Sequence, residues 1–401
     1  MESAQISFGH HEFLKDVLTL LLLLAVIGYC MNRFAVMQGG IDFPEFYSAA
    51  RLLAQGHGHE IYNVAAQNNS QVTYTGRIGT YFNHPSFELL IYLPFCFLPV
   101  KDAYLLWSLL SLALLGVTAK LLQRELWPSQ SWRILLLGSL IFVPILLTLI
   151  QGQDSILLLF LITKSFVSLK HEKEFRAGGW LALGLFKFQI VLPIIFLAGI
   201  MRRRAVLGFS VVLAFLALTF IAISGWHAPI EYARFLMHTS TLPLAGIHPQ
   251  AMANLRGLST QFLSLPRLSL AITIVASLLV VGLALRDAIR SGNTGTGDVD
   301  LTFAEAIVAA TLVSYHISPH DLSILLLPIT WTLLHASRTW KTSWFLHVIS
   351  LTTCIVLLLP PLHLWLLDRH QYVYMVVPLV TLFAVMRRGF SWRFARPTQV
   401  A

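Results

Sequence analysis

Long apolar stretches alternate with short polar connectors along almost the whole chain. A helix that crosses a bilayer needs about 20 consecutive, mostly apolar residues. Stretches near this length predict membrane-spanning helices near residues 14–33, 102–123, 134–150, 153–170, 203–224, 263–286, 302–316, 321–338, 343–359 and 371–387. The pattern therefore predicts an all-α protein that crosses a membrane many times.

Two apolar regions depart from this regular pattern. Residues 84–99 are apolar but short, and they contain three prolines, so we expect a re-entrant or juxtamembrane helix there. Residues 178–200 carry Lys187 at their centre and Pro193 beyond it, which predicts two half-helices that meet near the lysine. Irregular backbone at membrane depth is tolerated only where protein or a water-filled cavity surrounds it. Both regions are therefore candidate walls of a cavity.

Charge is scarce in this chain and is placed in the connectors. Of its 401 residues 56% are hydrophobic and 12% are charged, whereas a soluble domain carries about a quarter charged residues. The net charge of +9 could suggest a nucleic-acid partner, but the basic residues are spread over short connectors. An excess of Lys and Arg marks cytoplasmic connectors, and this rule places both termini inside, with about 12 crossings. We take only orientation from these clusters, whose simplest role is solvation.

The same topology assigns the other connectors to the outer face, where most His, Asn, Gln and Pro residues collect. The first outer loop covers residues 34–101. A flexible cytoplasmic linker, residues 291–301, would separate an N-terminal catalytic module, residues 1–290, from C-terminal transmembrane helices, residues 302–401. The three cysteines lack metal-site or redox spacing, so we expect buried free thiols.

Asp42 stands in the first outer loop, at the start of "DFPEFYSAARLLAQG". Asp at the N-cap, Pro44 in the first turn and Glu45 three residues on predict the start of a helix. Its apolar stripe predicts an amphipathic helix on the outer membrane surface. Asp42 is therefore either a helix cap or a carboxylate that accepts a proton from a substrate hydroxyl. A carboxylate has two oxygens, so both roles can coexist.

Several motifs occur in an order that resembles glycosyltransferase family 87, membrane mannosyltransferases of the GT-C superfamily that use polyprenyl-phosphate sugars. The matching stretches are "IDFPEFYSAARLLAQGHGHEIYN", "FNHPSFELLIYLPFCFLP", "LIQGQDSILLL", "GGWLALGLFKFQIVLPIIFLAGIMRRR" and "SYHISPHDLSILLLP". The resemblance covers roughly residues 35–340. It implies a GT-C fold in a bacterial cytoplasmic membrane and chemistry at the periplasmic face.

The resemblance also implies roles for residues. Asp42 matches the outer-loop aspartate that acts as general base with inversion at the sugar. The donor is a lipid-linked sugar, most simply mannose, and the acceptor is a glycolipid or glycan. Neither a cofactor nor a metal is expected, since side chains can neutralise a lipid monophosphate.

Six further residues are candidates for substrate binding. Lys187 is assigned to the donor phosphate, because a lysine inside an apolar run is costly without a function. Snorkelling or a carboxylate pair is the alternative. The others are His84, Gln153, Arg256, His320 and Asp321, as contacts to sugar or phosphate. A helix-capping role is the alternative for Asp321, and packing at the membrane interface is the alternative for His84. A metal site from His316, His320 and Asp321 lacks a fourth ligand.

Three other functions are consistent with parts of the sequence. A transporter or flippase would explain the irregular segments, but no internal repeat is evident and the polar groups gather at one face. Another lipid-linked transferase, such as a ligase, would carry its large outer loop late in the chain. A scaffold without activity would leave the acids, lysine and histidines of one face unexplained.

Overall fold

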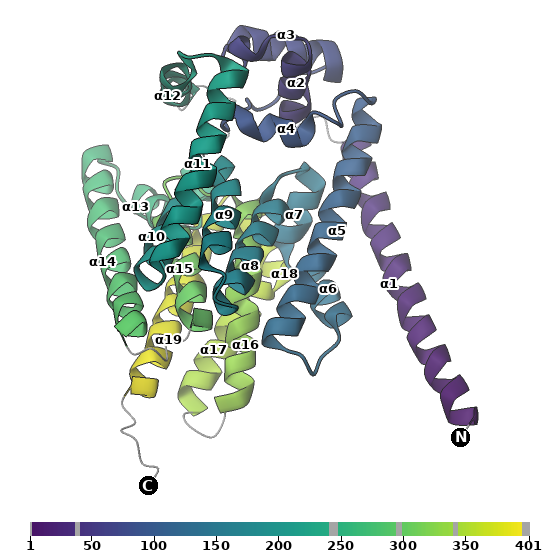
Figure 1. Cartoon of the computed structure of the whole chain (residues 1–401), viewed down its shortest axis with the longest axis vertical. Helices are drawn as coiled ribbons and strands as arrows, with labels where there is room; N and C mark the ends of the chain where they lie inside the picture. Colours follow the sequence, from purple (N-terminus) through teal and green to yellow (C-terminus); the bar gives the residue numbers. More distant parts are fainter. Residues whose placement is uncertain (1, 37–40, 240–247, 294–298, 340–343, 395–401) are drawn as a thin grey trace.

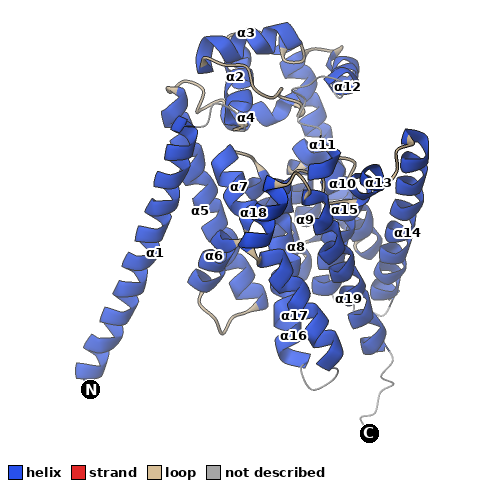
Figure 2. Ribbon diagram, turned by 180° about the vertical axis from the view of Figure 1, so that it is seen from behind, coloured by secondary structure: helices blue, strands red, loops and turns tan. Residues whose placement is uncertain are grey.

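The protein is helical throughout the part that the computed structural model describes. This part comprises residues 2–36, 41–239, 248–293, 299–339 and 344–394. A bundle of long helices carries a group of short helices across one end, as Figures 1 and 2 show. The predicted all-α class is confirmed for these residues.

Within the described residues, four helices are long and apolar enough to cross a membrane. They are α1 (Glu2–Val36), α5 (Val100–Leu126), α11 (Arg203–Ser224) and α14 (Pro266–Asn293). In α1 and α14 only 11% of the apolar window is buried inside the protein. Exposed apolar surface of this extent would cause aggregation in water. These faces are suited to lipid chains, and the chain is a membrane protein.

Three pairs of helices are sharply bent. These pairs are α6 (Trp132–Ile141) with α7 (Val143–Gln151), at 75°, α9 (Glu174–Leu183) with α10 (Phe188–Met201), at 63°, and α17 (Trp344–Leu358) with α18 (Pro360–Asp368), at 55°. Counted as single spans, they raise the described total to seven. The predicted bend beside Lys187 is confirmed. The twelve crossings and the GT-C arrangement stay predictions.

Shorter helices complete the bundle. They are α8 (Ser155–Lys170), α15 (Val299–Val313), α16 (Leu326–Thr339) and α19 (Val376–Phe394), with α13 (Leu255–Phe262), η3 (Leu185–Lys187), η4 (Pro249–Ala251), η5 (Pro319–Leu325) and η6 (Tyr372–Met375) between longer elements. Every residue of α15 from Leu301 to Leu312 is buried. Neighbouring helices rather than lipid surround it, so its length is not set by the thickness of a bilayer.

Residues 41–99 form an outer cap over one end of the bundle. It contains α2 (Phe43–Ala54), η1 (Gly58–Glu60), α3 (Val64–Thr75), η2 (Ser86–Glu88) and α4 (Leu89–Tyr92), and α12 (Ala228–Thr239) lies beside it (Figure 1). The helix predicted after Asp42 is present. Nine of its twelve residues are buried, so its apolar stripe packs against protein, and its place at the membrane surface stays a prediction. Residues 84–99 form only short helices and turns.

Two glycines allow the outer cap to approach the bundle closely. A Cβ atom on Gly58 would lie 2.1 Å from the Ile223 carbonyl oxygen of α11, and one on Gly152 would lie 2.6 Å from Phe43 Cβ. A side chain at either position would push the cap away. Residues 294–298 of the predicted linker lie outside the described residues, and the division into two modules stays a prediction. The three cysteines are buried free thiols, as predicted.

Candidate active site beneath the outer cap

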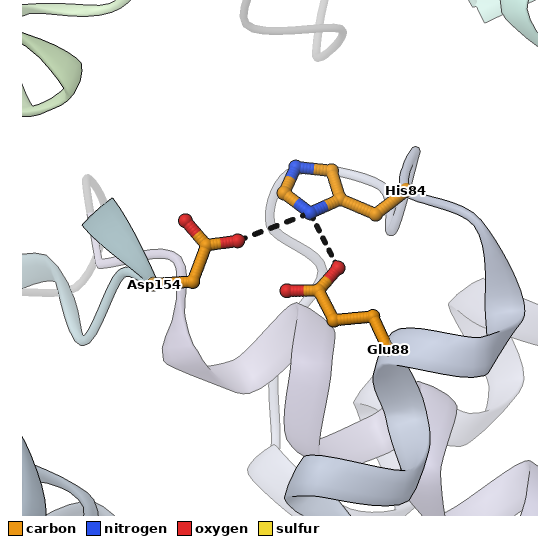
Figure 3. A group of neighbouring side chains, drawn as sticks. All are labelled: His84, Glu88 and Asp154. Carbon is orange, nitrogen blue, oxygen red and sulfur yellow. Dashed lines mark hydrogen bonds and ion pairs between the residues drawn. The ribbon is translucent and has the colours of Figure 1, made fainter. Parts of the chain in front are cut away.

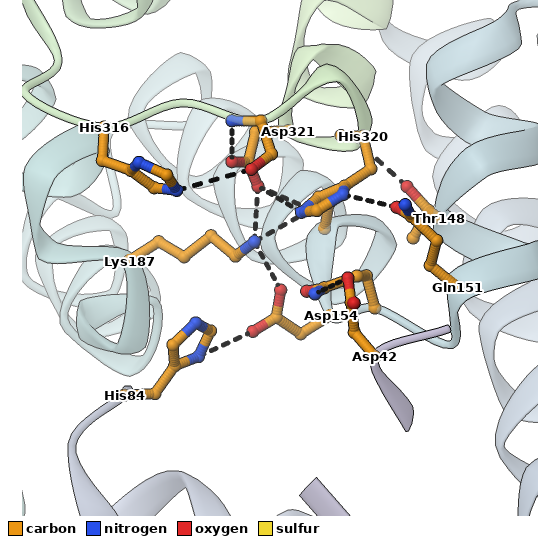
Figure 4. Close-up of polar contacts among 12 residues, drawn as sticks. Asp42, His84, Thr148, Gln151, Asp154, Lys187, His316, His320 and Asp321 are labelled. Carbon is orange, nitrogen blue, oxygen red and sulfur yellow. Dashed lines mark hydrogen bonds and ion pairs between the residues drawn. The ribbon is translucent and has the colours of Figure 1, made fainter. Parts of the chain in front are cut away.

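Lys187 is the centre of a buried polar cluster where the outer cap meets the bundle (Figure 4). The bend between α9 and α10 places it there, and its side chain is only 3% exposed. Its ammonium nitrogen Nζ lies 2.8 Å from Asp154 Oδ1, donates to Ser155 Oγ at 3.1 Å and pairs with Asp321. Lys187 is therefore paired with carboxylates and does not snorkel to the surface.

Asp154 and Asp321 stand at the starts of two helical segments, α8 and η5. Asp321 Oδ2 accepts the backbone N–H of Ser318 at 2.8 Å, while its Oδ1 faces Lys187 and accepts from Ser155 Oγ at 2.8 Å. Asp321 therefore caps its helical segment, as the sequence suggested, and also pairs with Lys187. The Lys187 ammonium contacts both carboxyl groups, and an opposite charge at this distance favours their ionised form. Both groups are therefore carboxylates.

Asp42 reaches the same cluster from the outer cap. It occupies the N-cap of α2, but its side chain makes no capping bond. Instead Oδ2 accepts from Gln153 Nε2 at 2.7 Å, and Oδ1 lies 3.5 Å from the Thr80 hydroxyl. The Asp42 backbone N–H also donates to the Gln151 carbonyl at 3.0 Å. The side chain is thus turned away from its own helix and toward the turn between α7 and α8.

That turn depends on Gly152. Its φ of +68° is in the left-handed region that favours glycine, and it ends α7 there. The absence of a side chain also admits Phe43, the residue after Asp42, at van der Waals contact. Conformation and space both favour glycine here, and together they place Asp42 against Gln153.

His84 forms a second group with Glu88 and Asp154 (Figure 3). Its Nδ1 lies 2.6 Å from Glu88 Oε2 and 3.3 Å from Asp154 Oδ2. Burial alone would lower the His84 pKa, but the two acids raise it to about 10. Burial raises the Glu88 pKa to about 8 against the opposing effect of His84. The contacts connect the cap to α8.

His320 lies on the bundle side of the cluster. Its Nδ1 is 2.6 Å from Gln151 Oε1, its Nε2 is 3.6 Å from Asp321 Oδ1, and its carbonyl accepts from Thr148 at 3.3 Å. Burial lowers the pKa of His320, so the ring is neutral near pH 7. It is placed to act as a hydrogen-bonding group rather than as a cation.

A model of glycosyltransferase family 87 matches residues 82–319, more than half of the chain. The chain belongs to glycosyltransferase family 87. The protein is therefore a membrane glycosyltransferase. The matched range contains His84, Gln153, Lys187 and Arg256, whereas Asp42 precedes it and His320 directly follows it. Neither the curated proteins nor the solved structures contain a match to the chain.

Arg256 of this glycosyltransferase lies apart from the cluster. Its guanidinium stacks on the Tyr315 ring, 3.8 Å from the centroid, and donates to the Tyr315 carbonyl at 2.9 Å. Tyr315 is 60% exposed. Among the predicted substrate-binding residues, the structure joins Lys187, Asp321, His320, Gln153 and His84 through shared partners, and it leaves Arg256 at the rim.

Some residues of the cluster, Glu88 and Ser155 among them, were not predicted from the sequence. Glu88 is four residues after His84 inside an apolar run, and an acid at that spacing is a detectable signal. Ser155 gives no such signal, because a serine at the start of a helix is ordinary. The residues with metal-ligand spacing differ from the group that the sequence suggested, His316 with His320 and Asp321. Among described residues, His84, Glu88 and Asp154 bring one ligand atom each within 4.8 Å of one another.

Proposed function

We propose that this glycosyltransferase moves one hexose, mannose, from a polyprenyl-phosphate donor to a glycolipid or glycan acceptor outside the bacterial cytoplasmic membrane, with inversion. Family membership supports glycosyl transfer, and the resemblance of the ordered motifs supports the lipid-linked donor. The basic connectors support an outward-facing site, since they favour the opposite face for the residues around Lys187.

The observation that carries the proposal is the difference between Asp42 and its two acidic neighbours. Asp154 and Asp321 are fully buried and contact the Lys187 ammonium. Asp42 is half-buried, and the hydrogen bonds described for its side chain come from the neutral groups of Gln153 and Thr80. A base must reach the acceptor hydroxyl and must be able to take its proton. Of these three acids, Asp42 fits that role.

The leaving group explains the cation beside the base. Glycosyl transfer passes through an oxocarbenium-like state, and the polyprenyl phosphate departs as an anion. Lys187 and neutral His320 would meet the phosphate oxygens with donors already fixed in place, which stabilises the developing charge. Arg256 at the rim would contact the phosphate as it enters.

The donor class is tested with purified protein in nanodiscs. We expect transfer of radiolabelled mannose from polyprenyl-phosphate-mannose to one member of a panel of lipid and glycan acceptors. Polyprenyl diphosphate sugars and nucleotide sugars serve as competing donors, and product configuration is read by anomer-specific mannosidases. Transfer only from a diphosphate or nucleotide donor would overturn the proposed donor. Movement of the intact donor across the bilayer without transfer would favour the transporter reading.

A further inference from the structure

The group formed by His84, Glu88 and Asp154 has the geometry of a cation site. One nitrogen and two carboxylate oxygens face one another from the cap and from the start of α8 (Figure 3). Bonds from a divalent transition metal to such atoms are about 2.0–2.2 Å long. The 3.3 Å between His84 Nδ1 and Asp154 Oδ2 is near the spacing of ligands that share an ion, whereas the 2.6 Å to Glu88 Oε2 is a hydrogen-bond distance that an ion would widen.

An unpaired buried oxygen points to the same place. Glu88 is 0% exposed, and its Oε1 has no hydrogen-bond partner among the described residues. Leaving a buried carboxylate oxygen unsatisfied costs about 1–3 kcal/mol or more. Asp154 uses Oδ1 toward Lys187 and Oδ2 toward His84, so its carboxylate can bridge the lysine and a second cation.

A divalent ion at this group would add positive charge beside the donor. Asp154 and Asp321 pair with Lys187, and His84 lies between Glu88 and Asp154 as a second cation. A divalent ion in place of the His84 proton would carry one more positive charge, which attracts a phosphate.

We propose that His84, Glu88 and Asp154 bind a divalent transition-metal cation, of which Mn²⁺ is the probe. Imidazole and carboxylate together favour ions such as Mn²⁺ and Zn²⁺ over Ca²⁺, which prefers oxygen ligands alone. Three protein ligands leave open coordination positions. The cation must displace the proton on His84 Nδ1, so its affinity rises with pH.

The site would supply charge for the phosphate, and this role alone rests on the proposed function. An open position beside Lys187 would accept one phosphate oxygen of the donor. The cation would then act as a Lewis acid on the leaving group, while Asp42 remains free to take the acceptor proton. Binding of the ion itself does not depend on the identity of the donor.

The experiment measures Mn²⁺ binding to detergent-purified protein that has been stripped with EDTA and dialysed. Electron paramagnetic resonance reports free Mn²⁺ during titration at pH 8. We expect one ion per chain in the wild type and at least tenfold weaker binding in Glu88→Gln and His84→Gln. Glu305→Gln is the matched control, because Glu305 is a 1% exposed carboxyl that also lacks hydrogen-bond partners among described residues. It should bind Mn²⁺ like the wild type.

Two results would overturn the proposal. One is a wild type that binds no Mn²⁺ at 1 mM (about ten times a 0.1 mM Kd). The other is equal binding in all four proteins. Because the first result needs only the wild type, variants that fail to fold do not leave the question open. Mannose transfer that persists at the wild-type rate in EDTA would overturn the Lewis-acid role of the cation and leave the proposed function standing, while the titration alone decides whether the site exists.

Discussion

Two buried ion clusters in this molecule are built on different kinds of backbone. The Lys187 cluster lies where helices end and turn, at the bend of α9 and α10 and at the starts of α8 and η5. The second joins Arg387 of α19 to Asp287 of α14 at 2.7 Å and to Glu305 of α15 at 3.9 Å. It is made by side chains on continuous helices.

The backbone at each cluster indicates its role: the Lys187 cluster can receive a ligand, whereas the Arg387 cluster connects helices. Helix ends leave backbone donors and acceptors free, and short loops there can admit a substrate. Continuous helices satisfy their own backbone, so the Arg387 cluster can do little beyond holding three helices together. The acidic partners of Arg387 in this cluster are buried side chains.

The largest expected effect comes from removing the cation of each cluster. Lys187→Met should destabilise the protein by about 3–5 kcal/mol, because it leaves two buried carboxylates without a cation. It should also abolish transfer. Arg387→Met should cost about 1–3 kcal/mol and leave the transfer rate of the folded protein unchanged. Thermal unfolding in detergent and initial rates measure both quantities.

A triple variant separates folding from function at Lys187. Lys187→Met combined with Asp154→Asn and Asp321→Asn removes the unpaired charges and should recover most of the lost stability without recovering transfer. Recovery of transfer as well would show that Lys187 is only structural. Loss of transfer in folded Arg387→Met would remove the distinction between the two clusters.

Gly152→Ala tests how the cap is held against the site. The positive φ and the 2.6 Å approach to Phe43 Cβ predict a loss of about 2–4 kcal/mol and a marked loss of transfer, because Asp42 is displaced. Gly56→Ala is matched in φ, at +83°, but nothing lies within 4 Å of the added methyl group. It should cost about 1 kcal/mol and retain transfer. Equal effects of the two variants on transfer would contradict this account.

The third prediction concerns pH and stability without metal. The pKa of His84 is raised from 6.5 to about 10 and that of Glu88 from 4.5 to about 8, so the folded state holds protons that the unfolded state releases. For His84 this stability is complete below pH 6.5 and is lost as pH rises through 10. For Glu88 it is complete below pH 4.5 and is lost through pH 8. We expect stability in EDTA to fall as pH rises from 6.5 to 10.

His84→Gln should flatten this slope, and Mn²⁺ should flatten it in the wild type, since the ion replaces the protons. The midpoint of thermal unfolding across pH, with EDTA or with Mn²⁺, gives the three curves. A slope that is the same in His84→Gln and in the wild type would mean that other groups set it.

The smallest effect is expected at Arg256. Its side chain contacts Tyr315 at the rim, so Arg256→Ala should leave stability within about 1 kcal/mol of the wild type. The KM for the donor should rise a few-fold with little change in kcat, and the difference should shrink in high salt. A large fall in kcat would place Arg256 inside the reacting site.

The sequence predicted the chemistry of single residues better than their partnerships. Lys187 was detectable because a lysine in an apolar run is costly, and the helix after Asp42 was detectable from its cap and stripe. The ion pairs of Lys187 could not be predicted from the sequence. Its partners Asp154 and Asp321 are 167 positions apart (321 − 154) and meet only through the fold. The requirement for glycine at position 152 was equally unpredictable, because it arises from the close approach of Phe43 in the fold.

The central claim is that Asp42, and neither of its ion-paired neighbours, takes the acceptor proton. Single-turnover mannose transfer is compared between wild type and Asp42→Asn, with donor binding measured on the same samples. Asparagine keeps the size of the side chain and an oxygen for Gln153. The account predicts a rate at least about 100-fold lower with donor binding intact. Transfer at the wild-type rate would contradict it and would leave Asp42 as a contact between the cap and the bundle.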